Sequence, residues 1–275
     1  MRSYKPLVSL FLALLLTFPV RAAEGVRPSA RHAVLIDADS LEVLYEKEAH
    51  TPAPMASTTK IMTAAVVLSS LSVDTQVSVP PEAVGVEGTS AYLAAGERLR
   101  VLDLLYALLL GSANDAAVAL AIATDGSVSA FVAHMNEVAR ALGLTQTSFQ
   151  NPHGLPDEGH ETTAYELALI AAYAMRMPLF AEIVGTKSYH FRSSLREHAF
   201  HNHNRLLSYS DEAIGVKTGY TKASGRCLVG AARRDGTTLI SVTLCAPDDW
   251  RDHRALWDYG FHLLAIPTPK TKTIS

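Results

Sequence analysis

The hydrophobic pattern at the start of the folded part alternates as in a strand and then becomes helical. Residues 32–36 and 42–45 are short apolar or alternating runs around the polar segment 37–40, which predicts a β-hairpin. From residue 55 to residue 71 apolar side chains recur at helical spacing, directly after two prolines, where a helix can begin but not continue. The pattern therefore predicts two strands followed by a helix.

The same helical spacing predicts four further helices, over residues 99–110, 114–123, 128–142 and 163–175. The third of these ends at Gly143, because glycine is preferred just beyond a helix end, and the fourth stops before Pro178. The second is alanine-rich, which is typical of a buried helix. The middle of the chain is therefore predicted to be a helical block.

Strand-like segments dominate from residue 184 to residue 244. The runs 226–232 and 238–244 flank Asp235-Gly236, and Asp-Gly between apolar runs is a strong hairpin signal. A helical or mixed stretch, 251–264, follows. This order predicts an α+β fold, in which the helical block packs on an antiparallel sheet shared by the N- and C-terminal segments. No repeat or obvious linker divides the sequence, so one domain is expected.

Residues 1–22 have the features of a signal peptide. Arg2 and Lys5 precede a mostly apolar run, Leu7–Val20, and small residues surround the expected cleavage site after Ala22. That run is about 14 residues long, which is short for a membrane span of about 20. A core helix is the alternative, but two cations at the extreme N-terminus disfavour it. We expect a secreted or extracytoplasmic, wall-associated protein, which only this N-terminal segment could tether to a membrane.

The charge of the chain argues against nucleic acid as a partner. There are 24 Lys+Arg and 27 Asp+Glu, a net charge of −3, and no basic stretch typical of a nucleic-acid surface. Cleavage after Ala22 would remove three cations and no acid, which changes the net charge to −6.

The two cysteines, Cys227 and Cys245, are predicted on neighbouring strands of the second hairpin. Export would permit a disulfide bond between them. Two buried free thiols are favoured instead, because strand-opposed cysteines often have poor disulfide geometry. Their spacing does not fit a metal site.

Ser57 and Lys60 are the first candidates for catalysis. Positions three apart share a helix face, so the hydroxyl and the amine would lie side by side at the start of helix 55–71. A lysine whose pKa is lowered by burial and nearby cations can take the proton of a serine and make it a nucleophile. The first helical turn also offers unpaired N–H groups to an oxyanion. The alternative is that Ser57 or Thr58 only caps the helix.

Ser112 and Asn114 form a second candidate pair, between two predicted helices. A loop there can project a hydroxyl and an amide into a cleft, where Ser112 would relay a proton and Asn114 would hold a peptide substrate. Helix capping is again the alternative, because Ser and Asn are both preferred caps.

Lys217, Thr218 and Gly219 form the third candidate. A strand beside the site would present Lys217 and Thr218 as a seat for a carboxylate, while Gly219 would let a ligand approach the backbone. The alternative is an exposed strand end followed by a turn.

The three motifs in this order resemble the signature of the low-molecular-mass penicillin-binding proteins, within the serine-type D-alanyl-D-alanine carboxypeptidase family. The middle motif reads S-A-N here, with its serine and asparagine retained, and segments 55–64, 147–156 and 215–221 are also similar to that family. The resemblance covers roughly residues 30–261. It implies a fold like that of serine β-lactamases and penicillin-binding proteins, with residues 23–275 as a single D,D-peptidase domain that lacks a C-terminal β-domain.

The resemblance also implies an activity. The enzyme would remove the terminal D-Ala of peptidoglycan stem peptides through an acyl-serine intermediate, would be acylated by β-lactams, and would need no cofactor. Ser57 would attack the carbonyl of the penultimate D-Ala, Lys60 would act as general base, and Ser112 would pass a proton toward the leaving D-Ala.

Substrate binding is assigned by the same resemblance. Asn114 would hold the peptide, Lys217 and Thr218 would bind the terminal carboxylate, and Gly219 lies beside them. The backbone N–H groups of Ser57 and Tyr220 would form the oxyanion hole. An arginine after the third motif, Arg251 or Arg254, could also contact the carboxylate, although a surface position is the favoured interpretation for either.

Three other functions use part of the same sequence pattern. A β-lactamase is disfavoured because residues 144–149 contain no acid that could deacylate the enzyme. A transpeptidase or endopeptidase would use the same site, and a catalytically silent binding module is disfavoured by the intact motifs. No Ser-His-Asp arrangement can be assigned to the histidines, and the alternation of His201 and His203 favours solvated or core roles for them.

Overall fold

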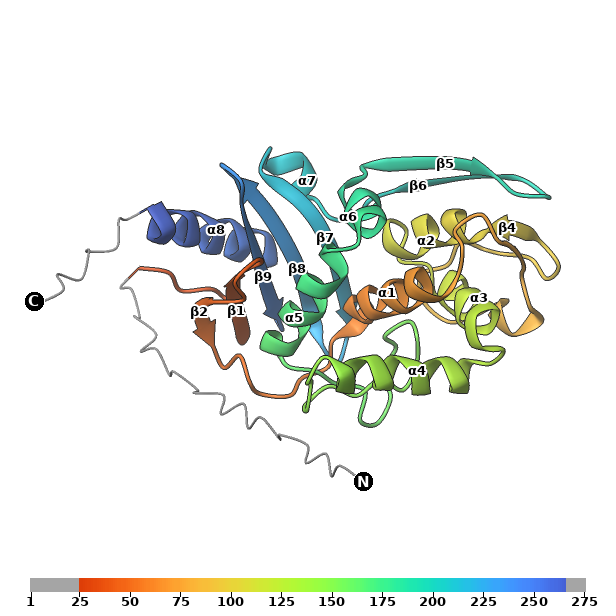
Figure 1. Ribbon diagram of the computed structural model, residues 1–275, viewed down its shortest axis with the longest axis horizontal. Coiled ribbons are helices and arrows are strands. Elements are labelled where there is room, and N and C mark those ends of the chain that lie inside the picture. Colours follow the sequence, from red (N-terminus) through yellow and green to blue (C-terminus); the bar gives the residue numbers. More distant parts are fainter. Residues whose placement is uncertain (1–24, 266–275) are drawn as a thin grey trace, which may run out of the picture.

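A five-stranded antiparallel sheet forms the centre of the protein, as the computed structural model in Figure 1 shows. The structure describes residues 25–265, so the predicted signal peptide lies outside the described residues. The strand order is β2-β1-β9-β8-β7, and all neighbours are antiparallel. The strands are β1 (His32–Asp37), β2 (Val43–Lys47), β7 (Ala213–Thr221), β8 (Gly225–Arg234) and β9 (Thr237–Leu244). Pairing of β1 with β9 confirms that the two ends of the folded part share one sheet.

The predicted second hairpin is confirmed. Strands β8 and β9 are joined at Asp235 and Gly236, which both have positive φ angles of 49° and 85°. A two-residue turn with two positive φ angles matches the right-handed twist of the strands, which explains the Asp-Gly pair.

Helices cover both faces of the sheet, and residues along each strand alternate between them. Leu35 and Leu239 pack against Trp257 of helix α8 (Asp249–Ala265), which lies on one face. Their neighbours Val34 and Ile240 face the larger core formed with the helical block. Because both faces are buried, these strands have few polar positions, and the predicted α+β architecture is confirmed (Figure 1).

The helical block covers one face of the sheet with α5 (Ala164–Met175) and extends past the β7 edge (Figure 1). Its other helices are η1 (Ala56–Thr59), α1 (Lys60–Ser70), η2 (Pro81–Ala83), α2 (Val101–Leu109), α3 (Asn114–Asp125), α4 (Val128–Ala141) and α6 (Pro178–Gly185), whereas the short α7 (Leu206–Tyr209) lies beside β7 and packs with α8 through Leu206. The alanine-rich α3 is buried over its first two turns, as predicted. Two small sheets complete the block, formed by β3 (Gln76–Ser78) with β4 (Arg98–Arg100) and β5 (Ser188–Arg192) with β6 (Glu197–His201).

Helix α6 was not predicted, and one predicted helix boundary was wrong. The helix predicted over residues 163–175 does stop before Pro178, but Pro178 then begins α6, because proline fits the first helical position, where no N–H bond is needed. The helix predicted from residue 99 begins at Val101, because residues 98–100 pair with β3.

Helix α8 is held on the sheet by a buried histidine. His253 is fully buried, with Nδ1 2.6 Å from Ser241 Oγ and Nε2 3.0 Å from Thr243 Oγ1 on β9. Burial lowers the pKa of His253 to about 3, so the ring is neutral at physiological pH. Gly230 leaves room for it, since a Cβ there would lie 2.6 Å from Nδ1.

Both cysteines are free thiols, as favoured from the sequence. Cys227 is buried on β8, but Cys245 is exposed, contrary to the prediction that both are buried. The reason is that Cys245 follows the last residue of β9 and has a positive φ angle of 54°, where the chain leaves the sheet.

Among residues 25–265, no single helix has the length and apolarity to cross a membrane.

Candidate active site

Ser57 lies in a 3-10 turn, η1, that leads directly into α1. The predicted helix 55–71 therefore begins with a tighter turn than an α-helix. The hydroxyls of Thr58 and Thr59 donate to the carbonyls of Met55 and Ala56, at 2.6 and 2.8 Å, and hold this turn. The Ser57 hydroxyl makes no capping bond, so the alternative that it only caps the helix is wrong.

Lys60 is completely buried, and its amine has three partners. Nζ lies 3.0 Å from Ser57 Oγ, 2.7 Å from Asn114 Oδ1 and 2.6 Å from the carbonyl oxygen of His153. The predicted neighbourhood of Ser57 and Lys60 is confirmed by the first distance. The Asn114 amide is oriented by its Nδ2, which donates to the Glu87 carbonyl at 2.6 Å, so that Oδ1 faces Lys60.

The surroundings of Lys60 favour a neutral amine. Burial lowers its pKa well below the ordinary value, the nearby Lys217 lowers it further, and Asp115 opposes them. The asparagine and carbonyl oxygens can only accept, so they take the two hydrogens of a neutral amine. Its lone pair is then left for the hydroxyl proton of Ser57, which is the arrangement that a general base requires.

Ser112 and Lys217 form a second hydroxyl–amine pair. Lys217 Nζ donates to Ser112 Oγ at 3.0 Å and to the Thr218 carbonyl at 2.9 Å. Ser112 has a positive φ angle of 58° and precedes Ala113, the N-cap of α3, so its hydroxyl does not cap that helix. Lys217 is buried, contrary to the alternative of an exposed strand end, and burial lowers its pKa to about 7. An amine with that pKa can both give and take a proton near neutral pH.

Asn114 lies behind Ser57, at the Lys60 amine. Its side chain contacts Lys60 and the Glu87 carbonyl, and it is not among the residues that line the pocket in front of Ser57. The next residue, Asp115, accepts from Ser90 Oγ and from the N–H groups of Ala91 and Leu93 at 2.6–3.0 Å. Both residues tie the loop before β4 to α3, and thereby fix one wall of the site.

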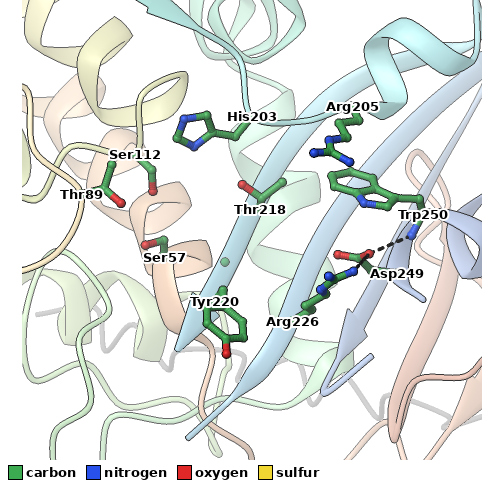
Figure 2. A pocket seen from close by; sticks show the side chains of 11 residues that line it. Ser57, Thr89, Ser112, His203, Arg205, Thr218, Tyr220, Arg226, Asp249 and Trp250 are labelled. Carbon is green, nitrogen blue, oxygen red and sulfur yellow. Dashed lines mark hydrogen bonds and ion pairs between the residues drawn. The ribbon is translucent and has the colours of Figure 1, made fainter. Parts of the chain in front are cut away.

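A pocket of about 400 Å³ opens in front of Ser57. Figure 2 shows Ser57, Thr89 and Ser112 on one side, with the edge strand β7 running between them and a group of charged side chains. Residues of β7 form the floor, and Gly219 is needed there because a Cβ would lie 3.0 Å from the Ser57 nitrogen. The lining residues are Ser57, Thr89, Ser112, His203, Arg205, Thr218, Gly219, Tyr220, Arg226, Asp249 and Trp250.

The arginines in this pocket are two that the sequence did not single out, and Arg251 and Arg254 lie outside it, in agreement with the favoured interpretation of both. Arg205 and Arg226 line it, whereas Arg251 and Arg254 line a second hollow that shares only Trp250 with the first. Arg226 lies 3.7 Å from Asp249, whose side chain is 5% exposed. Burial raises the pKa of Asp249. The two arginines make this end of the pocket suited to a carboxylate.

Sequence reasoning missed several residues of the pocket. His203 follows β6 and lines the pocket, where burial and the nearby Lys217 lower its pKa. Asp249 and Trp250 stand at the first turn of α8, for which no motif exists. A single sequence gives no signal for such contacts, because they depend on how α8 and the chain after β6 dock. Residues 25–265 contain no group of three or more metal-ligating side chains.

Comparisons with known proteins agree with this geometry. Residues 20–248 match the family model described as D-alanyl-D-alanine carboxypeptidase. The D-alanyl-D-alanine carboxypeptidase DacF of Bacillus subtilis is 34% identical over 247 residues, which are 85% of this chain and 64% of the relative. This chain thus spans less than two-thirds of that relative's length.

Solved structures are similar over nearly the whole described chain. The Streptomyces K15 DD-transpeptidase superposes with a TM-score of 0.83 at 34% identity, covering 87% of this chain and all of that one. An evolved penicillin-binding protein homolog from Mycobacterium tuberculosis gives a TM-score of 0.84 at 32% identity, covering 91% and 97%. The predicted penicillin-binding-protein-like fold is confirmed, and the chain belongs to the D-alanyl-D-alanine carboxypeptidase family of serine peptidases.

Proposed function

We propose that this protein is a serine D,D-carboxypeptidase that removes the terminal D-Ala of peptidoglycan stem peptides and is acylated by β-lactams. The observation that carries the proposal is the fully buried Lys60, whose amine lies 3.0 Å from Ser57 Oγ while two carbonyl-type oxygens take its hydrogens. A buried neutral lysine beside a half-exposed serine is the chemistry of an activated nucleophile.

In the acylation step Ser57 Oγ forms a bond to the carbonyl carbon of the penultimate D-Ala, and its proton passes to Lys60 Nζ. The tetrahedral intermediate then loses the C–N bond. The leaving nitrogen takes a proton from the Ser112 hydroxyl. Lys217 Nζ, 3.0 Å from Ser112 Oγ, then gives a proton to Ser112 and restores its hydroxyl. The products are acyl-Ser57 and free D-Ala.

Deacylation restores the starting state. A water oxygen attacks the ester carbon and gives its proton through Ser112 to Lys217. Ser57 Oγ leaves and takes back the proton held by Lys60, so both lysines return to their initial charge. The pKa of Lys217, lowered by burial to about 7, suits this two-way role.

Substrate binding is assigned to the charged end of the pocket. Lys217, Thr218 and one or both of Arg205 and Arg226 would hold the terminal carboxylate, and Gly219 lets the peptide lie against β7. The Ser57 and Tyr220 N–H groups would receive the oxyanion. Asn114 acts through Lys60 in this proposal, since its side chain is engaged there.

The choice of acyl acceptor and the location are further parts of the proposal. One related structure is named a transpeptidase, and an amine acceptor would use the same acyl-Ser57 as water does. A substrate in the cell wall requires an extracytoplasmic enzyme, in agreement with the signal-like residues 1–22. A β-lactamase is not supported, because the one acid among the described lining residues, Asp249, is paired with Arg226.

The test is the intact mass of the protein at intervals after mixing with benzylpenicillin. We expect a persistent adduct that is absent in a folded Ser57→Ala variant, together with release of D-Ala from a D-Ala-D-Ala peptide. An adduct that vanishes with rapid turnover would indicate a β-lactamase. No adduct from folded wild-type protein would indicate a silent binding module and contradict the proposal.

A further inference from the structure

One buried histidine near the nucleophile has no part in the chemistry above. His160 is 5% exposed and follows the segment 147–156. Its Nε2 lies 2.8 Å from Thr59 Oγ1, and its Nδ1 lies 3.0 Å from the backbone nitrogen of Gln150. His160 and Thr59 are 101 positions apart in the chain, so this contact is made only by the fold.

These two contacts determine where the ring carries its proton. A backbone N–H can only donate, so the Gln150 N–H requires a lone pair on Nδ1. Nε2 therefore carries the hydrogen and donates to Thr59 Oγ1. Burial lowers the pKa of His160 to about 4, with Lys60 also lowering it and Asp157 opposing, so the ring stays neutral near pH 7.

The hydroxyl of Thr59 connects His160 to the peptide group that precedes Ser57. Having accepted from His160, Oγ1 donates its own proton to the Ala56 carbonyl at 2.8 Å. Ala56 has a positive φ angle of 49°, which is strained for a residue with a Cβ and must be held by its surroundings. Gly154 packs against the same carbonyl, since a Cβ there would lie 1.9 Å from the Ala56 oxygen.

Fixing the Ala56 carbonyl also fixes the Ser57 N–H. The C=O and N–H of one trans peptide point in opposite directions, so the N–H must point away from Thr59. Gly219 of β7 is close to it, because a Cβ there would lie 3.0 Å from the Ser57 nitrogen. Within residues 25–265 this N–H donates to no other group, which leaves it free for a ligand.

We propose that His160 and Thr59 are positioning residues, which hold the Ala56–Ser57 peptide so that the Ser57 N–H meets the oxyanion formed during acylation. The proposal rests on the proposed function, because it assumes that Ser57 is acylated. Loss of a whole oxyanion donor typically costs about 10²–10³ in rate. A donor that is present but misdirected should cost less, about 10- to 100-fold.

A matched pair of variants at Thr59 tests the proposal. Thr59→Val keeps the shape and removes the hydroxyl, whereas Thr59→Ser keeps the hydroxyl and removes the methyl group. For the full-length protein we expect Thr59→Val to lower the benzylpenicillin acylation rate constant about 10- to 100-fold relative to Thr59→Ser. Noncovalent binding before acylation should change by less than about threefold, because the N–H acts mainly on the transition state.

A second pair addresses the histidine. His160→Gln retains an amide donor toward Thr59, whereas His160→Leu does not, so His160→Gln should recover part of the rate lost in His160→Leu. The double variant Thr59→Val/His160→Leu should acylate about as slowly as Thr59→Val alone, because one chain of hydrogen bonds is broken in both. Rates are corrected for the fraction of protein that can be acylated, so that unfolded material does not count.

The outcomes separate this proposal from the proposed function. If Thr59→Val acylates within about threefold of Thr59→Ser, or if the two substitutions multiply in the double variant, the positioning role is wrong while the function stands. Nitrogen NMR of the imidazole provides an independent test, since a proton on Nδ1 of His160 would overturn the chain of hydrogen bonds. Absence of an adduct in folded wild-type protein would overturn the function, and the catalytic part of this proposal with it.

Discussion

Changing Asn114 to aspartate should disable Lys60 as a base by charging it. Asn114 Oδ1 lies 2.7 Å from Lys60 Nζ, and Asp has nearly the same shape as Asn. At that distance a carboxylate and an ammonium attract by about 6 kcal/mol at an effective dielectric constant of about 20. Even half of that energy favours the charged amine more than a hundredfold, because each 1.36 kcal/mol is a factor of ten. Lys60 would then be cationic at neutral pH and unable to take the Ser57 proton.

The assay is the rate constant of benzylpenicillin acylation, followed by intact mass between pH 6 and pH 10. We expect Asn114→Asp to be at least about a hundredfold slower than wild type at pH 7. Relative to wild type at the same pH, its rate should rise up to tenfold per pH unit on the alkaline side as its Lys60 loses the proton. The wild-type rate should show no such rise, since burial lowers the pKa of Lys60, and loss of the Lys217 proton above about pH 7 affects both proteins alike.

The matched control is Asn114→Leu, which removes both amide contacts without adding a charge. It should also be slow, because Lys60 is less well oriented, but its pH profile should not move to higher pH. The reasoning is refuted if Asn114→Asp acylates within about fivefold of wild type at pH 7, or if its profile is no more alkaline than that of Asn114→Leu.

Three further predictions follow from the packing and the charges. In urea unfolding, Gly154→Ala should destabilise the protein by at least about 2 kcal/mol more than Gly126→Ala does. Both glycines have positive φ angles, but only at Gly154 would a Cβ collide, at 1.9 Å from the Ala56 oxygen. The free energy of unfolding should be fully retained above about pH 6.5 and should fall as the pH drops toward 4. Burial lowers the pKa values of His153, His160 and His253 to about 4, 4 and 3, so in this range the unfolded chain binds protons on these rings and the folded protein does not. Each histidine should contribute a slope of about 1.4 kcal/mol per pH unit, measurable as a smaller pH dependence in His253→Asn. Arg226→Ala or Arg205→Ala should raise the KM for a D-Ala-D-Ala peptide about tenfold, as expected for a lost charge-assisted hydrogen bond, whereas Arg251→Ala should leave it unchanged because Arg251 lies outside the pocket.

The first motif and the second hairpin were readable from the sequence because each depends on neighbouring residues. Ser57 and Lys60 are three apart on a helical turn, so their contact at 3.0 Å follows from local geometry. Asp235 and Gly236 specify their turn in the same way. The short apolar runs 32–36 and 238–244 also predicted strands, since a strand buried on both faces is apolar along most of its length.

Local rules misjudged the details that depend on side-chain competition. The turn before α1 is a 3-10 helix because the hydroxyls of Thr58 and Thr59 bond to the preceding carbonyls. Capping preference suggested that Ser112 or Asn114 only begins a helix as its N-cap, but the fold directs their side chains to Lys217 and Lys60 instead. Helix propensity cannot weigh a partner that lies 54 or 105 positions away.

The charged end of the pocket was decided by tertiary packing alone. Trp257 and Phe261 bury one face of α8 on the sheet, and this fixes the rotation of the whole helix. Asp249 is thereby placed in the pocket, and Arg251 is placed outside it. The sequence by itself determined the residue types, their local spacing and the family. Which distant groups meet Ser57, and how burial changes their charge, was decided only when the helices docked and excluded water.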